Sequence, residues 1–174
     1  MRRTIVVVDY DPAWAEAFRE LAGVIAAAVG ERPVRIEHIG STSVPGLAAK
    51  PIVDIVVISR RADLPAVIAR LAPLGYEHQG DGGIAERESF RRESTNVPRD
   101  GSARVWSNHY LYVCDAASPE LARQIAFRDY LRAHPEAATA YSNLKKDLAA
   151  RFPHDIGSYI AGKGPFIEEV LRQG

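Results

Sequence analysis

Hydrophobic and polar positions follow two different periods along this chain, and each period predicts one kind of element. Short β-branched or apolar runs predict strands at residues 5–8, 34–39 and 52–58. The third run is almost continuously apolar, as expected for a central strand that is covered on both faces. Residues 104–114 are rich in aromatic and β-branched side chains and predict a long strand. The charged segment 84–92 fits either an edge strand or a strand that faces a cleft.

Apolar residues at intervals of three and four predict helices elsewhere in the chain. One helix is expected over 12–29, with Asp11 as its N-cap, and another over 64–74. Between the second and third predicted strands, a turn-rich connection is expected to open a short helix around 43–49. Three further helices are expected after Ser118, which offers an N-cap followed by a proline.

The order of these elements predicts an α/β (α+β) fold, a sheet flanked by helices with further helices at the C-terminus. The 174 residues suit a single domain, with an α/β core over 1–115 and a helical part over 116–174. Apolar residues make up 47% of the chain and charged residues 25%, so a packed hydrophobic core is expected.

Charge and hydropathy limit the kinds of molecule that the protein is expected to bind. Lys+Arg and Asp+Glu number 22 each, so the net charge is zero and nothing global favours nucleic acid or anionic lipid. No apolar stretch approaches the roughly 20 residues that cross a bilayer, and the N-terminal run is too short for a signal peptide. We therefore expect a cytoplasmic protein without membrane contact. Its one cysteine, Cys114, lies in an apolar run and is expected to be reduced and buried.

Candidate chemistry gathers around Asp54, which interrupts the apolar strand 52–58. Because a buried charge without a partner is strongly disfavoured, this carboxylate predicts a polar site at the end of the sheet. It could hold Mg²⁺ that bridges phosphate oxygens, or it could be a structural carboxylate that accepts hydrogen bonds. Gly40 permits close approach of a ligand, and Ser41 and Thr42 add hydroxyl donors. A plain strand-to-helix turn would account for the same three residues.

Other polar residues along the first two thirds of the chain are candidates for the same site. Lys50 fits either a phosphate contact or an ion pair with Asp54. His38 fits an acid or base, a residue that orients the turn, or a structural histidine. Arg91 could bind phosphate if the segment 84–92 lines the cleft, although the segment also fits a solvated edge strand.

The last predicted strand and the C-terminal helices carry the remaining candidates. A period of two places Tyr110 and Tyr112 on one face of the strand and His109 on the other. These side chains either line a pocket or pack in the core. Arg128 fits either a phosphate contact or an ion pair between helices. The helical part offers Arg128, Lys145 and Lys163 as candidate phosphate contacts.

Residues 38–55, which include the Gly-Ser turn and the strand carboxylate, resemble the signature of the GrpB family. They are also similar to the domain that is fused to the C-terminus of some dephospho-CoA kinases. The resemblance extends to residues 8–14, 109–113 and 121–134, so it covers nearly the whole chain. It implies a nucleotidyltransferase-like mixed sheet, in which a Gly-Ser turn holds nucleotide phosphates and carboxylates on the next strand bind divalent metal.

Carried over to this chain, the resemblance matches Gly40 and Ser41 to the turn and Asp54 to the first strand carboxylate. Active members of that superfamily usually have Asp-x-Asp or Asp-x-Glu, whereas this chain has Val56 at the second position. Two Mg²⁺ ions beside one phosphate chain need several anionic ligands, so a distant glutamate would have to substitute. The candidates for that role are Glu86, Glu88 and Glu93.

The sequence leads to hypotheses of three kinds. The first is binding of a nucleotide or another phosphorylated ligand, with transfer of a nucleotidyl group if Asp54 holds metal. The second is a catalytically inactive binding or regulatory module that keeps the phosphate-binding turn, and the absent second carboxylate favours it. The third is a structural role within a homodimer.

Overall fold

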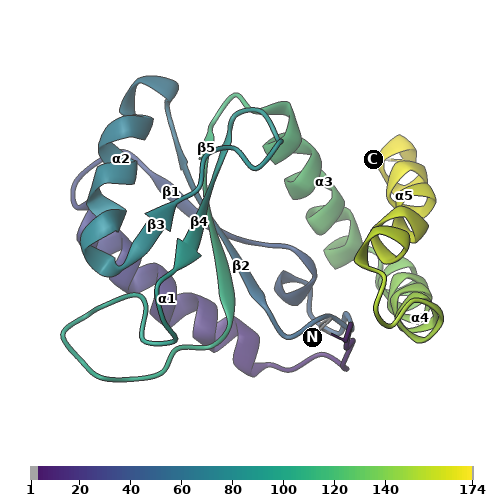
Figure 1. The fold of residues 1–174 in the computed structure, drawn as a ribbon. Coiled ribbons are helices and arrows are strands. Elements are labelled where there is room, and N and C mark those ends of the chain that lie inside the picture. Colours follow the sequence, from purple (N-terminus) through teal and green to yellow (C-terminus); the bar gives the residue numbers. More distant parts are fainter. Residues whose placement is uncertain (1–3, 174) are drawn as a thin grey trace.

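A mixed five-stranded sheet forms the centre of the molecule, and the computed structural model describes it within residues 4–173 (Figure 1). The strand order is β1-β2-β5-β4-β3. Strands β2 and β5 are parallel, and every other neighbouring pair is antiparallel. The strands are β1 (Arg35–Ile39), β2 (Val53–Ser59), β3 (Tyr76–His78), β4 (Arg87–Arg92) and β5 (His109–Asp115). The predicted α/β (α+β) class with a mixed sheet is confirmed.

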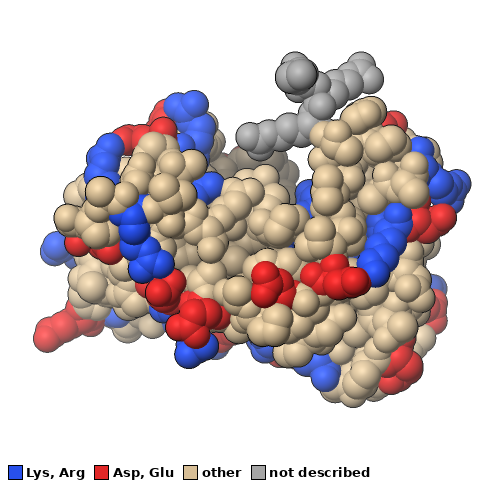
Figure 2. Space-filling view, turned by 90° about the horizontal axis from the view of Figure 1, so that it is seen from below, with Lys and Arg blue, Asp and Glu red and all other residues tan. Residues whose placement is uncertain are grey.

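Helices cover both faces of this sheet (Figure 1). The helices α1 (Ala13–Val29) and α2 (Leu64–Leu71) pack on one face, and α3 (Pro119–Ala133) packs on the other. Two more helices, α4 (Pro135–Arg151) and α5 (Ile156–Gln173), pack against α3 and against each other. No helix within residues 4–173 is long and apolar enough to cross a bilayer. Charged residues of both signs alternate over one face of the surface (Figure 2).

The alternation of side chains along β2 decides which residues face the helical part. Val53, Ile55 and Val57 enter the main core with α1 and α2. Asp54 and Val56 therefore point to the other face, toward α3. Strand β5 continues the pattern, because Asp54 pairs with Tyr110 and Val56 with Tyr112 across the parallel ladder. The predicted placement of these two tyrosines on one face, opposite His109, is confirmed. Cys114 is buried, as expected.

Local signals in the sequence explain where the helices begin. Asp11 Oδ1 accepts a hydrogen bond from the Ala13 N–H at 2.9 Å at the start of α1, and Pro12 adopts helical dihedrals there. Ser118 caps α3 by accepting from the Leu121 N–H at 3.3 Å. Both caps match the predicted helix starts.

Three expected elements differ in the structure. Residues 5–8 form no strand of the sheet, since only Val8 makes a bridge, with Ala49, while Ile5 packs against α4 and α5. In place of a helix over 43–49 there is one short 3₁₀ turn, Ser41–Ser43. The predicted long strand over 104–114 begins only at His109. For the charged segment 84–92, the edge-strand alternative is ruled out, because the short strand β3 pairs outside β4.

Candidate functional site

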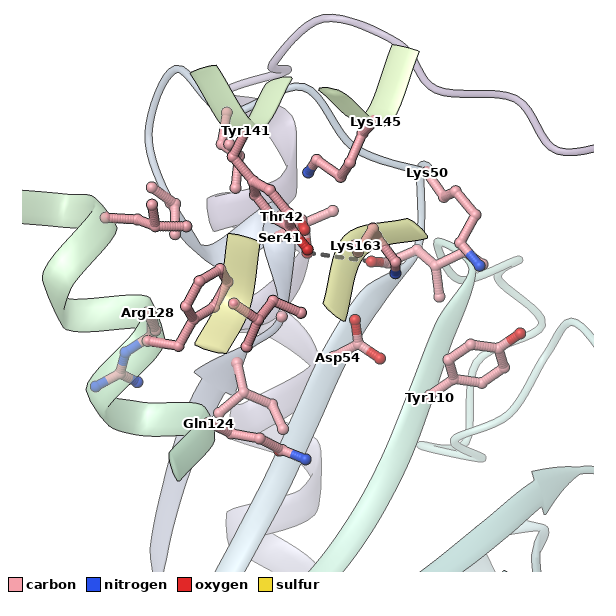
Figure 3. A pocket seen from close by; sticks show the side chains of 18 of the residues that line it. Ser41, Thr42, Lys50, Asp54, Tyr110, Gln124, Arg128, Tyr141, Lys145 and Lys163 are labelled. Carbon is pink, nitrogen blue, oxygen red and sulfur yellow. Dashed lines mark hydrogen bonds between the residues drawn. The ribbon is translucent and has the colours of Figure 1, made fainter. Parts of the chain in front are cut away.

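A cavity of about 340 Å³ lies between the α3 face of the sheet and the helical part (Figure 3). The turn that follows β1 forms one wall, and strands β2 and β5 form the floor. Helices α3, α4 and α5 close the other sides. The sequence-predicted residues that line it are Gly40, Ser41, Thr42, Lys50, Asp54, Tyr110, Tyr112, Arg128, Lys145 and Lys163.

The turn after β1 and the carboxylate of β2 form one continuous wall. Gly40 has φ of 71° and ψ of −177°, a conformation that only glycine adopts readily. A Cβ atom at this position would clash with the carboxylate of Asp54, so the carboxyl group lies directly against the turn. An anion that approached the turn would therefore also approach Asp54.

Cationic side chains lie near Asp54, but none of them among the described residues is close enough to form an ion pair with it. Burial raises the pKa of Asp54 to about 7, and the positive charges of Lys50, Lys163 and Arg87 oppose that rise. Figure 3 shows the Asp54 carboxyl group directed toward the side of the cavity where Lys163 lies. Among residues 4–173, no cation lies within ion-pair distance of Asp54, in contrast to the 16 ion pairs formed elsewhere.

Three of the four lysines in the chain line this cavity. Lys145 is only 2% exposed, and its Nζ has no hydrogen-bond partner among the described residues. Burial lowers the pKa of Lys145 to about 7, and Lys163 adds to that effect. Burial also lowers the pKa of Lys163 to about 8. The fourth lysine, Lys146, lies outside the cavity and pairs with Asp9 at 2.5 Å.

The three cavity lysines contact tyrosine rings and form no ion pair with a carboxylate among the described residues. The Lys145 Nζ lies 4.6 Å from the centre of the Tyr141 ring, one helical turn earlier on α4. The Lys163 Nζ lies 4.7 Å from the Tyr159 ring on α5, and the Lys50 Nζ lies 5.9 Å from the same ring. Cation–π contacts orient an ammonium group without neutralising its charge. The cavity therefore keeps its positive potential.

Arg87, on β4, adds a fourth cation to the lining of the cavity. Its guanidinium carbon lies 4.7 Å from the centre of the Tyr112 ring, and its buried Nε has no hydrogen-bond partner among the described residues. In the sequence, Arg87 belongs to the charged segment 84–92, for which either an edge strand or a strand that faces a cleft was expected. Its position on β4, opposite Cys114, places it on the same face as Asp54.

His38, a candidate acid or base, lies on the other face of the sheet, because it pairs with Ile55. It stacks on Phe18 with 4.8 Å between ring centres, and burial lowers its pKa to about 4. Thr42 Oγ1 donates to the Ile52 carbonyl at 3.1 Å, so it accepts from His38 Nε2–H at 3.0 Å. This chain of hydrogen bonds connects His38 to the turn, which matches the predicted alternative that it orients the turn.

Two further candidates also lie outside the cavity. His109 is 1% exposed, donates from Nδ1 to the Ser107 carbonyl at 2.8 Å, and accepts from the Tyr76 hydroxyl at 2.7 Å. Arg91 is exposed and bonds through Nε to Glu77 on β3 at 3.1 Å.

Arg128 lines the cavity only with its side-chain stem. Its guanidinium is directed away from Asp54 (Figure 3). It donates to Glu37 Oε2 at 2.7 Å, to the His38 carbonyl at 3.0 Å and to Asp129 Oδ1 at 2.8 Å. The guanidinium therefore stabilises the junction between α3 and β1.

The donor set of the cavity does not fit a centre with two divalent metal ions. Asp54 is its only carboxylate among the described residues, and no group of three or more His, Cys, Asp and Glu lies close enough to hold a metal there. Val56, at the second expected position, is fully buried in an apolar cluster with Ile39 and Leu121. The three glutamates that could have substituted, Glu86, Glu88 and Glu93, contact Arg61, His78 and Arg99 instead.

One feature of the helical sequence distinguishes the cavity lysines from surface lysines. The buried residues of α4 recur at helical spacing, and Lys145 falls in that series between Tyr141 and Leu148. A lysine on the apolar stripe of a helix indicates a buried ammonium group. The tyrosine four residues before Lys145 is repeated before Lys163, as Tyr159. Both lysines were predicted as candidate phosphate contacts, but this signal was not part of the reason.

The fold defines the class to which the protein belongs. It superposes on the Cid1 poly(U) polymerase, in a structure with MgGTP bound, with a TM-score of 0.56 at 14% identity. The match covers 83% of this chain and 45% of that one. The likeness concerns the fold alone, which is nucleotidyltransferase-like.

Within that class the chain belongs to the GrpB family. A family profile described as GrpB protein matches residues 4–173. The crystal structure of the conserved protein GrpB from Enterococcus faecalis has a TM-score of 0.78 and 35% identity, over 97% of this chain and 96% of that one. These matches confirm the resemblance that the sequence indicated.

Relatives of greater length contain this unit as a part. The UPF0157 protein YqkA of Bacillus subtilis is 36% identical over 96% of this chain, which spans 46% of that protein. A dephospho-CoA kinase of Mycolicibacterium paratuberculosis is 25% identical over 99% of this chain, again across 46% of its own length. The chain therefore spans about half the length of these two relatives.

Proposed function

We propose that this protein binds a small phosphorylated molecule, such as a nucleotide, in the cavity between the sheet and the helical part. The observation that carries the proposal is the convergence of Lys50, Arg87, Lys145 and Lys163 on one cavity, where Asp54 is the single carboxylate among residues 4–173. Two of these cations have buried nitrogen atoms without a partner. Buried polar groups in native proteins are nearly always bonded, and both nitrogens would be satisfied by donating to a bound phosphate.

The size and lining of the cavity support a small organic ligand. A volume of about 340 Å³ lies at the lower end of the range for small-molecule sites. Beside the cations, the helical part contributes apolar and aromatic walls from Phe127, Leu131 and Ile167. Phosphate groups would contact the lysines, and the less polar remainder of the ligand would lie along these walls.

Two of the proteins that this chain resembles in fold or sequence favour the same chemical class. The fold is shared with a polymerase whose structure holds MgGTP, and the sequence is shared with part of dephospho-CoA kinases. We do not propose transfer of a nucleotidyl group, because the described residues of the cavity lack the carboxylates that would hold two metal ions. The proposal is binding without transfer.

Calorimetric titration of inorganic tripolyphosphate and of ATP tests this function. Lys145→Met should weaken binding by roughly 10- to 100-fold, the value of one charged hydrogen bond of about 1.5–3 kcal/mol. Lys146→Met is the matched control, since this neighbouring lysine lies outside the cavity. Its affinity should equal that of the parent. Absence of binding by the parent, or an equal loss in both variants, would contradict the proposal.

A further inference from the structure

A phosphate bound at the turn would lie beside a second negative charge. The carboxyl group of Asp54 lies against Gly40 so closely that even a methyl side chain there would clash with it. Two adjacent anions in a partly buried cavity repel each other strongly, because little water screens them. Such a site needs positive charge that contacts both groups.

In this structure, the positive charge near Asp54 comes from side chains of the protein. Lys50 and Lys163 both oppose the rise in its pKa, and both ammonium groups lie over the ring of Tyr159, at 5.9 and 4.7 Å from its centre. An ammonium group has three hydrogen-bond donors, so it can bond a carboxylate and a phosphate oxygen together. A lysine can thus connect the two anions, as a bridging metal ion does elsewhere.

The strand leaves no second carboxylate to hold such a metal ion. Val56, the next residue of β2 on this face, is fully buried in the apolar cluster with Ile58 and Leu121. A charged side chain at this position would be desolvated inside that cluster, which is strongly disfavoured. Within residues 4–173, the cavity therefore combines one carboxylate with the cationic groups of Lys50, Arg87, Lys145 and Lys163, the reverse of the balance in a metal centre.

We propose that the cavity binds its phosphorylated ligand without a divalent metal ion, with the ammonium groups of Lys50 and Lys163 supplying the positive charge beside Asp54. This inference rests on the function proposed above and specifies how the site meets its ligand. It assigns Asp54 a role opposite to that of a metal ligand. The carboxylate competes with the bound phosphate for the two lysines and lowers the affinity of the site.

The direction in which one substitution changes the binding affinity distinguishes a metal-bridged site from a metal-free one. Asp54→Asn keeps the shape of the side chain and removes its negative charge. In a site where Asp54 holds a bridging metal, this change weakens binding severely. In a site where lysines contact both anions, the same change removes a repulsion and frees the lysines. We expect tripolyphosphate to bind Asp54→Asn about 3- to 30-fold more tightly than the parent, from one like-charge contact in a partly hydrated cavity.

The experiment is a calorimetric titration of tripolyphosphate into the parent, Asp54→Asn, Lys163→Met and Lys146→Met proteins, each in EDTA and in excess MgCl₂. The expected result is binding in EDTA that is at least as tight as in MgCl₂, since Mg²⁺ complexes the free ligand. Lys163→Met should lose at least about tenfold in both buffers, the value of one charged contact. Lys146→Met should match the parent.

The outcomes distinguish this inference from the proposed function. Binding by the parent that appears only with MgCl₂, or that is lost in Asp54→Asn, overturns the metal-free arrangement and leaves phosphate binding in place. Absence of binding in both buffers overturns the proposed function and this inference together. Circular dichroism of each variant establishes that the protein is folded before it is titrated.

Discussion

Replacement of Lys145 by methionine should stabilise the protein, although it removes a residue of the proposed binding site. The ammonium group of Lys145 is buried at 2% exposure without a hydrogen-bond partner among the described residues. Methionine has a similar length and fills the same space beside Tyr141 without a charge. The variant therefore keeps the packing of α4 and loses the cost of burying an unpaired cation.

The magnitude follows from the pKa of Lys145, which falls from 10.5 to about 7 in the folded protein. At about 1.4 kcal/mol for each pH unit, this difference corresponds to roughly 4–5 kcal/mol. Water in the open cavity screens part of the charge, so we expect about 2–3 kcal/mol in practice. Lys163 titrates beside it, with a pKa of about 8, and shares the same cavity.

The same pKa difference determines how the stability of the parent changes with pH. Between pH values of about 7 and 10.5, the unfolded chain keeps the proton on Lys145 while the folded protein has released it. The unfolded state then binds more protons, so the stability of the parent rises with pH in this window. Below about pH 7 both states are protonated and the full cost remains. The advantage of Lys145→Met should thus be greatest near neutral and acidic pH and should shrink toward alkaline pH.

Urea unfolding monitored by tryptophan fluorescence measures this effect. The free energies of unfolding of the parent and Lys145→Met are compared at a series of values from about pH 6 to about pH 10. Lys146→Met serves as the control, since its exposed ion pair with Asp9 contributes little. A variant that is less stable than the parent at about pH 6, or a difference that stays constant with pH, would refute the reasoning.

Two pairs of glycines give further tests by thermal or urea unfolding. Gly40→Ala should destabilise the protein by about 3 kcal/mol or more, because a Cβ there clashes with Asp54 and the backbone has positive φ. Gly46→Ala, with φ of 78° and no atom within 4 Å of the added Cβ, should cost only about 1–2 kcal/mol, and equal losses would argue against the contact. On α5, Gly162→Ala meets a leucine of α4 and should cost about 1–3 kcal/mol. Gly23→Ala, in the interior of α1 and with nothing within 4 Å of the added Cβ, should stabilise by about 0.5–1 kcal/mol, so similar effects at the two positions would contradict the packing.

The sheet was predictable wherever burial on both faces left an unbroken apolar run. Strand β2 is the clearest case, because six of its seven residues are buried and Asp54 is the one exception. Strand β3 was missed since it has three residues, Tyr76–His78, of which only Tyr76 is buried. Residues 5–8 have the composition of a strand, yet they run over α4 and α5. Local composition cannot tell whether an apolar segment joins a sheet or covers a helix.

The position of the site was predictable from the sequence, but only some of the residues that line it were. The turn at Gly40 and the carboxylate of Asp54 are close in sequence and converge on one wall, as the pattern of β1 and β2 implies. Period two also gave the correct face for Tyr112. It could not show how far along β4 the cavity extends, and so Arg91 was chosen where Arg87 lines the cavity. That limit depends on how α3, α4 and α5 pack, which local spacing does not encode.

The cavity lysines are more informative than the turn, because they are not explained by the fold. A helix that packs through an apolar stripe gains stability from a leucine or methionine at such a position, and α4 has a lysine there instead. The same tyrosine-to-lysine spacing of four occurs on α5, with Lys163 aimed at the same cavity. Two helices thus place a lysine in the same cavity, and the one on α4 is buried where an apolar residue would fold better. Residues that oppose stability in this way are expected at binding sites, which is why these lysines support the proposal of an anionic ligand.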